Sequence, residues 1–293
     1  MDDEHELDWS RITMKEKVGS GITAVVYRGL LDGSIEVAVK EIEWNKGMLH
    51  ERQQVAAFDR EVAIMAKVKH DNLVHFHGVV SVERPFRIIT EFCGGGCCFE
   101  LLHNEEDIEL VWAQQHKMCL DVAYAIEYLH SFTPKIIHRD LKSLNLLLAA
   151  PVPDNRTKPI VKVSDFGLSR MQDTAGGEWG KMTIAAGTCH WMAPEVFTSP
   201  SYDESVDVYS YAMIMFEIIC REIPFEEEEP ADVGRLILQG RRPDLDAVPP
   251  DCPPLLRDLM IRSWALEPTA RPPFRQIVQE LSPLKQQLWP GNW

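Results

Sequence analysis

The stretch that decides the fold is His138-Arg139-Asp140-Leu141-Lys142-Ser143-Leu144-Asn145, which places a carboxylate, an ammonium group and an amide within a few residues. Asp165-Phe166-Gly167 follows twenty residues after Asn145, and Ala193-Pro194-Glu195 ends thirty residues after Asp165. Taken singly, each of these polar residues is most simply a surface residue. Their presence together at these positions argues against that simple interpretation.

The chain around this stretch changes character near residue 94. Before it, Gly19-Ser20-Gly21 and the alternating run Val37-Ala38-Val39-Lys40 indicate strands, with a hairpin turn at Asp32-Gly33. Further strands are predicted over residues 73–80 and 86–92, and one helix over residues 55–68. Gly94-Gly95-Gly96 suits a connector. Beyond it we predict helices over 112–130 and 209–219, the second apolar nearly all round and therefore central.

Composition limits the class of protein. The chain has 293 residues, 45% of them apolar, and a net charge of −15 from 30 Lys and Arg against 45 Asp and Glu. These values are typical of a globular protein, and the acidity argues against binding to nucleic acid or anionic membranes. The four consecutive glutamates at 226–229 are expected to be solvated.

The sequence also indicates in which cellular compartment the protein is expected. The acidic N-terminus is not typical of a signal or transit peptide, and no apolar run approaches the roughly 20 residues of a membrane-spanning helix, so no membrane insertion is expected. Seven cysteines without a CxxC pair indicate reduced thiols rather than disulfides or a zinc ribbon. We therefore expect a cytoplasmic or nuclear protein.

Taken together, these motifs resemble the signature set of a eukaryotic protein kinase catalytic domain, from about residue 12 to about residue 282. The opening Asp8-Trp9-Ser10-Arg11-Ile12 and the closing Arg271-Pro272-Pro273-Phe274 resemble the tyrosine kinase-like group, which includes mixed-lineage and Raf-like Ser/Thr kinases. The resemblance implies an α+β, bilobal fold. It places an acidic tail at 1–11, a small antiparallel-sheet lobe with one main helix at 12–93, a larger helical lobe at 97–288 and a second tail at 289–293.

The resemblance also implies a reaction, the transfer of the ATP γ-phosphate to a protein hydroxyl with Mg²⁺. Asp140 would accept the hydroxyl proton, and Lys142 would neutralise the transferring group. Asn145 and Asp165 would offer oxygen ligands to Mg²⁺. Lys40 would hold the α- and β-phosphates, with Glu61 on the predicted helix as its anionic partner.

The resemblance places ATP between the lobes, near a glycine loop in which Ala24 replaces the usual third glycine. Thr90 would be the gatekeeper, and backbone groups of Glu91 and Cys93 would bind the adenine edge. A lining role for Cys93 is favoured over a reactive thiol. The full set of implied ATP-binding residues is Gly19, Ser20, Gly21, Val26, Ala38, Lys40, Thr90, Glu91, Cys93 and Leu147.

Other motif residues are expected to be structural. The resemblance pairs Glu195 with Arg271 and directs backbone hydrogen bonds of the catalytic loop to Asp207. His138 lies beside the catalytic residues and so suggests a general base, but it matches a packed histidine of the family that supports Phe166.

Lys142 and Gly187-Thr188 favour Ser/Thr specificity, while dual or tyrosine specificity and a nucleotide-binding pseudokinase scaffold remain the alternatives. Regulation is expected through phosphorylation of Thr183 in the activation segment, with Arg139 and Arg170 answering the phosphate and Thr188 committed to the catalytic site. Protein substrates and ATP are the implied partners. The oligomeric state is open.

Overall fold

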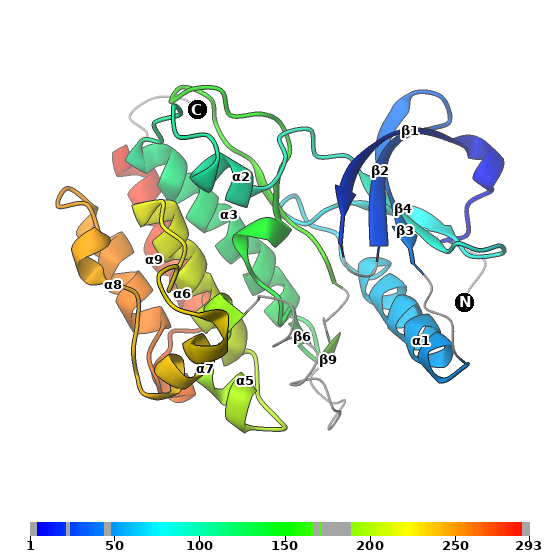
Figure 1. Cartoon of the computed structure of the whole chain (residues 1–293). Helices are drawn as coiled ribbons and strands as arrows, with labels where there is room; N and C mark the ends of the chain where they lie inside the picture. Colours follow the sequence, from blue (N-terminus) through cyan, green and yellow to red (C-terminus); the bar gives the residue numbers. More distant parts are fainter. Residues whose placement is uncertain (1–4, 22–23, 44–47, 167–169, 172–188, 289–293) are drawn as a thin grey trace. The chain divides into compact units, whose positions relative to one another are not determined.

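A computed structural model describes residues 5–21, 24–43, 48–166, 170–171 and 189–288. The chain divides into two compact units, Met1–Gly94 and Gly95–Trp293 (Figure 1). The division falls inside the glycine run that the sequence marks as a connector. Each unit is described by itself below.

The first unit is built on a five-stranded antiparallel sheet in the order β1-β2-β3-β5-β4. Its strands are β1 (Ile12–Ser20), β2 (Ala24–Leu31), β3 (Ile35–Ile42), β4 (Phe76–Val80) and β5 (Arg87–Glu91). The predicted turn at Asp32-Gly33 is confirmed, with φ angles of 52° and 73°, a conformation that glycine adopts freely and aspartate tolerates.

One face of this sheet forms an apolar core. Val37, Val39 and Ile89 are completely buried there, together with residues from β1, β2 and β4. Because side chains alternate along a strand, Ala38 and Lys40 project from the opposite face. The alternation seen in the sequence of β3 therefore separates core residues from candidate site residues.

Helix α1 spans Met48–Met65. It begins earlier and ends sooner than the predicted helix over residues 55–68. The sequence before Val55 is a polar run, His50 to Gln54, which lacks the apolar spacing on which the prediction depended but consists of residues that tolerate a helix.

Residues 5–11, which lie in the predicted acidic tail at 1–11, contact the sheet of the first unit. Glu6 forms a parallel bridge with Val79 of β4, and the amide of Leu7 donates to the carbonyl of Val79 at 2.7 Å. The 3₁₀ turn η2 (Trp9–Arg11) follows, and the guanidinium of Arg87 lies 3.9 Å from the Trp9 ring centroid. These contacts offset the acidity that suggested a tail.

The second unit is mainly helical. Its helices are α2 (Cys98–His103), α3 (Trp112–His130), α5 (Pro194–Thr198), α6 (Ser205–Cys220), α7 (Pro230–Leu238), α8 (Pro254–Ser263) and α9 (Phe274–Leu288). Short pairs of strands join β6 (Ile136–Ile137) to β9 (Arg170–Met171) and β7 (Leu146–Leu148) to β8 (Val161–Val163). The remaining 3₁₀ turns are η3 (Ser143–Asn145), η5 (Cys189–Trp191), η6 (Leu245–Ala247) and η7 (Pro268–Ala270).

Helix α6 is the centre of this unit, as its sequence predicts. It packs against α3 and α8 (Figure 1), and its side chains from Val206 to Ile219 are all buried. Predicted helix 112–130 coincides with α3. Within the described part of the chain, no helix combines the length and apolarity needed to cross a membrane.

Candidate functional site

The first unit contributes a partly buried ion pair. Lys40 Nζ on β3 lies 2.7 Å from Glu61 Oε1 on α1, with the side chains 25% and 8% exposed. The predicted pairing is therefore present, and the carboxylate holds the ammonium group at a fixed point on the sheet. Partial burial strengthens this attraction relative to a pair in water.

The register of the sheet brings several predicted ATP-binding residues onto the same face as Lys40. Val26 on β2 is the direct partner of both Gly19 and Lys40, and Ala38 is the partner of Thr90 on β5. Paired residues project to one side of an antiparallel sheet, so these side chains share one surface.

The remaining predicted ATP-binding residues occupy the ends of these strands or the second unit. Ser20 ends β1, and the amide of Gly21 donates to the carbonyl of Ala24 at 2.8 Å. Glu91 ends β5, where its amide donates to the carbonyl of His75, and Cys93 is buried beyond it. Leu147 belongs to β7 of the second unit.

The second unit gathers Asp140, Lys142 and Asn145 around one carboxylate. Lys142 Nζ lies 3.1 and 3.0 Å from the two carboxylate oxygens of Asp140. Asn145 Nδ2 donates to Asp140 Oδ2 at 3.0 Å and to the Asp140 carbonyl at 2.8 Å. The sequence spacing that singled out these residues thus corresponds to a single cluster.

Asp140 has an altered acidity in this setting. Burial raises the pKa of its carboxyl group, the cation of Lys142 opposes that rise, and the negative charge of Asp165 adds to it. The net direction is upward. A carboxylate whose pKa is raised is a better proton acceptor than an ordinary aspartate.

The β7–β8 hairpin places Asp165 beside this cluster. Leu146 pairs with Val163, and the amide of Ser164 donates to the carbonyl of Asn145 at 2.9 Å. Ser164 and Asn145, nineteen positions apart, are thereby joined next to the β7–β8 ladder. Asp165 is exposed and has a φ of 62°, a left-handed conformation that aspartate tolerates better than most residues.

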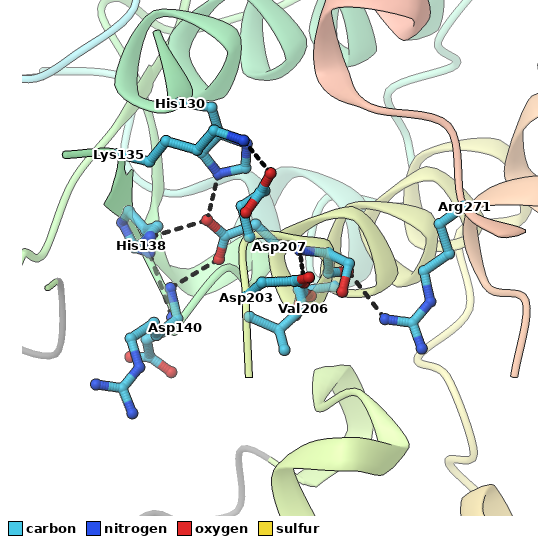
Figure 2. A network of polar contacts seen from close by, with 12 residues as sticks. His130, Lys135, His138, Asp140, Asp203, Val206, Asp207 and Arg271 are labelled. Carbon is cyan, nitrogen blue, oxygen red and sulfur yellow. Dashed lines mark hydrogen bonds and ion pairs between the residues drawn. The ribbon is translucent and has the colours of Figure 1, made fainter. Parts of the chain in front are cut away.

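Asp207, near the start of α6, holds the loop that carries His138 and Asp140 (Figure 2). Its carboxylate accepts the amides of His138 and Arg139, both at 2.8 Å, as predicted, and also bonds His130 Nε2 at 2.9 Å. Burial alone would raise the pKa of Asp207. Three neighbours outweigh burial and lower this pKa: His130 through its hydrogen bond and charge, His138 through its charge, and Arg139 through its amide.

His138 packs rather than facing a reaction partner. Its ring centroid lies 5.6 Å from that of Phe166, and Nε2 lies 3.0 Å from the carbonyl of Ser164. The predicted support of Phe166 is confirmed. The ring is completely buried, which does not suit a group that must reach a substrate.

The predicted regulatory residues are described only in part. Arg139 has a φ of 74°, donates through Nε to the hydroxyl of Tyr202 at 3.0 Å and stacks on the Tyr202 ring at 4.9 Å. Arg170 lies on β9 opposite Ile137. Thr183 and Thr188 fall outside the described residues, so their predicted phosphorylation and catalytic contacts stay predictions.

The sequence analysis missed Glu217, a completely buried carboxylate of α6. It accepts hydrogen bonds from Ser143 Oγ of the catalytic loop and from Trp191 Nε1, both at 2.5 Å, and contacts His103 Nε2 at 3.1 Å. The available signal was a single glutamate inside an otherwise apolar run. Together, Glu217 and Asp207 anchor both ends of the catalytic loop to one helix.

The donor set in the second unit fits a hard divalent cation. Asp165 is an exposed carboxylate, and the amide nitrogen of Asn145 donates to Asp140, which leaves the Asn145 side-chain oxygen as its potential ligand atom. Mg²⁺ is commonly bound by one or two such protein oxygens together with phosphate oxygens.

Comparison with known proteins identifies the chain. The family of protein tyrosine and serine/threonine kinases matches residues 12–281. The chain is 37% identical to the probable serine/threonine-protein kinase SIS8 of Arabidopsis thaliana (98% of this chain, 26% of that protein) and 36% identical to the serine/threonine-protein kinase CTR1 of the same plant (96% and 32%). It is 32% identical to the dual specificity protein kinase splA of Dictyostelium discoideum (97% and 12%).

The chain thus spans about a third or less of the length of each of these three relatives. The predicted kinship with the tyrosine kinase-like group is confirmed, as is the α+β kinase fold. The chain belongs to the family of protein tyrosine and serine/threonine kinases.

Proposed function

We propose that this chain transfers the γ-phosphate of ATP to serine and threonine hydroxyls of proteins. The observation that carries the proposal is the buried Asp140 carboxylate with Lys142 Nζ at 3.0 Å. It joins a proton acceptor to a cation at the place where phosphoryl transfer needs both.

As the substrate oxygen forms its bond to the γ-phosphorus, its proton passes to the Asp140 carboxylate, and the bond from the γ-phosphorus to the bridging oxygen of ADP breaks. Lys142 neutralises charge on the transferring group. The raised pKa of Asp140 favours this proton transfer.

The nucleotide phosphates would bind Lys40, which Glu61 orients, and the backbone near Gly19 and Gly21. Asn145 and Asp165 would hold Mg²⁺, which when bound neutralises charge on the phosphate oxygens. Val26, Ala38, Thr90, Glu91, Cys93 and Leu147 would line the adenine.

The test is incorporation of radiolabelled phosphate from ATP into protein substrates and into the chain itself, with Asp165→Asn beside the parent protein. We expect incorporation by the parent protein, loss of it with excess EDTA, and mainly phosphoserine and phosphothreonine on acid hydrolysis. Absence of incorporation by the parent protein with Mg²⁺ would instead support the pseudokinase alternative.

Dual specificity is the second candidate, because splA, which matches 97% of this chain, is described as a dual specificity protein kinase. Phosphotyrosine in the same hydrolysate at a level comparable to phosphothreonine would favour it. Lys142 beside Asp140 is the feature that favours Ser/Thr transfer in the first proposal.

Replacement of Lys40 by methionine is expected to lower kcat/KM for ATP about 100-fold, as expected for loss of one preorganised charge in a phosphoryl-transfer site. The substitution also leaves the carboxylate of Glu61 buried without its cation. Steady-state kinetics at varied ATP would measure the effect.

The matched control for Lys40 is Lys17→Met, which removes an exposed lysine from the same sheet. We expect less than a twofold change from this control. A loss of under threefold for Lys40→Met would contradict the phosphate-binding role.

We also propose regulation by phosphorylation of Thr183. Because Arg139 already engages Tyr202, a phosphate would have to compete with that contact or recruit Arg170. Full activity after exhaustive phosphatase treatment would argue against this regulation.

A further inference from the structure

Tyr202 lies in the segment between α5 and α6, outside the motifs that the sequence analysis singled out. Its hydroxyl accepts hydrogen bonds from Nε of Arg139, at 3.0 Å, and from Nη2 of the same guanidinium. The guanidinium carbon lies 4.9 Å from the centroid of the Tyr202 ring. Two charge-assisted hydrogen bonds and a cation–π contact therefore act on the side chain that precedes the proposed proton acceptor.

Arg139 depends on such contacts because its backbone is strained. Its φ of 74° lies in the left-handed region, which is costly for a residue with a Cβ and persists where the surrounding structure enforces it. The residue is half-buried, and within the described part of the chain no carboxylate pairs with its guanidinium. In that part of the chain, Tyr202 is therefore the side chain that holds Arg139.

The backbone conformation of Arg139 sets the course of the chain on both sides of it. The amides of His138 and Arg139 donate to the two carboxylate oxygens of Asp207, both at 2.8 Å (Figure 2). The residue that follows is Asp140, whose carboxylate lies 3.0 Å from Lys142 Nζ. A change in the φ of Arg139 would therefore displace the Asp140 carboxylate from Lys142, because φ and ψ are the only soft torsions of the backbone.

The segment that carries Tyr202 is itself fixed by other contacts. Lys135, just before β6, forms an ion pair with Glu204, two residues after Tyr202. From α9's side of the unit, the guanidinium of Arg271 donates to the carbonyl of Ser205 at 2.9 Å. Tyr202 is thus presented by a segment that does not depend on Arg139 for its own position, and it can serve as a fixed point for that arginine.

We propose that Tyr202 is a positioning residue for phosphoryl transfer. It holds the guanidinium of Arg139 and, through the strained backbone of that residue, keeps the Asp140 carboxylate in place. Because Tyr202 does not touch the reacting atoms or the nucleotide, its loss should lower kcat and leave KM for ATP nearly unchanged. The inference rests on the proposed function, since it takes Asp140 as the proton acceptor, and it applies to protein without phosphate on Thr183.

The kinetic test compares Tyr202→Phe and Tyr202→Ala with the parent protein, each after phosphatase treatment and by initial rates. Phenylalanine keeps the ring beside the guanidinium but removes the hydroxyl, so we expect kcat to fall about fivefold. Alanine removes the ring as well, and kcat should fall about 20-fold. KM for ATP should change by less than about twofold in both variants, with thermal unfolding to show that each variant folds.

The matched control is Tyr124→Phe, which removes the hydroxyl of another half-buried tyrosine of the second unit. The Tyr124 hydroxyl lies 3.2 Å from Ser282 Oγ, where α3 packs against α9, and its removal should change kcat by less than about twofold. A second arm adds Tyr202→Phe to Arg139→Leu. The hydroxyl has no guanidinium to hold in that background, so the added substitution should change kcat by less than about twofold.

Hydrogen exchange without ATP tests the same contact independently of the reaction. A peptide over residues 136–142 contains the two amides that donate to Asp207. In Tyr202→Phe we expect these amides to exchange about tenfold faster than in the parent protein, because the loop opens more often. Peptides from α8 should exchange at the parent rate, which distinguishes a local loss of order from a general loss of stability.

Three results would overturn the proposal: equal kcat in Tyr202→Phe and Tyr124→Phe, an undiminished effect of Tyr202→Phe in the Arg139→Leu background, or unchanged exchange over residues 136–142. The first two mean that the hydroxyl does not act on the reaction through Arg139, and the third means that it does not hold the loop. Absence of phosphate incorporation by the parent protein would instead contradict the proposed function, and the exchange result would still decide whether Tyr202 positions this loop.

Discussion

Asp140→Asn is expected to reduce kcat about 10³- to 10⁴-fold, with a small change in KM for ATP. The substitution keeps the shape of the side chain and its place beside Lys142 and Asn145 but removes the proton acceptor, a contribution of about 10²–10⁴ in general base catalysis. Steady-state kinetics with saturating protein substrate would measure the loss. A residual rate within tenfold of the parent would contradict the assigned role.

The raised pKa of Asp140 also predicts how kcat/KM depends on pH in the parent protein and in Asp140→Asn. Because its folded pKa is raised by burial against the opposing cation of Lys142, the acid limb of the kcat/KM profile should lie above the ordinary aspartate value of about 3.9. Below that limb the carboxyl group is protonated and cannot accept the hydroxyl proton. The limb should be absent from the profile of Asp140→Asn.

Asp140→Asn is expected to raise the thermal stability of the protein although it lowers its activity. A carboxyl group with a raised folded pKa binds its proton more tightly in the folded state, so folding is penalised above the folded pKa and the penalty disappears as the pH falls below the unfolded pKa. Asp140→Asn should therefore raise Tm at pH 7 by about 2 °C. This gain should shrink toward pH 4, and calorimetry at both pH values would reveal it.

Arg271→Ala is expected to lower the free energy of unfolding of the second unit by about 3–5 kcal/mol. The side chain of Arg271 is completely buried and forms a bidentate pair with Glu195, at 2.6 and 2.9 Å. It also donates to the carbonyls of Ser205 and Ala265, both at 2.9 Å, and of Leu266 at 3.2 Å. Its removal leaves a carboxylate and several carbonyls without their donor.

Urea unfolding followed by circular dichroism would measure this effect. The matched control is Arg262→Ala, since Arg262 also pairs with two carboxylates, Glu280 and Asp258, but is 34% exposed; exposed pairs contribute about 1 kcal/mol or less. Arg271→Lys should recover little, because an ammonium group cannot make the bidentate contact. Equal losses for Arg271→Ala and Arg262→Ala would contradict the argument.

Much of this arrangement could be predicted from local sequence. The catalytic loop and the Lys40–Glu61 pair were predictable because their residue types and spacing match motifs of the kinase family. Helix α3 coincides with its prediction because nineteen residues of apolar periodicity define it. In each case the prediction depended on residues within one helix or strand, or on a sequence motif.

The parts that escaped prediction depend on contacts between segments far apart in the chain. In the sequence, Glu217 only interrupts an apolar helix. Its role depends on hydrogen bonds from Ser143, 74 positions away, and from Trp191. Nothing in the sequence near His130 indicates that its ring forms a hydrogen bond with Asp207. The guanidinium of Arg221, just after α6, likewise donates to the carbonyl of Leu102, 119 positions earlier, and nothing in the local sequence indicates this contact.

The bridge between Glu6 and Val79 has a consequence for the sheet itself. β4 is an outer strand, and outer strands present unpaired amides and carbonyls that recruit other chains. The carboxylate of Glu6 accepts the amide of Ser81 at 2.7 Å just past the end of that strand, and Gly78 allows His5 to approach within contact of its backbone. Residues 5–7, which precede the span matched by the family, therefore cover part of this outer strand and limit its pairing with strands of other chains.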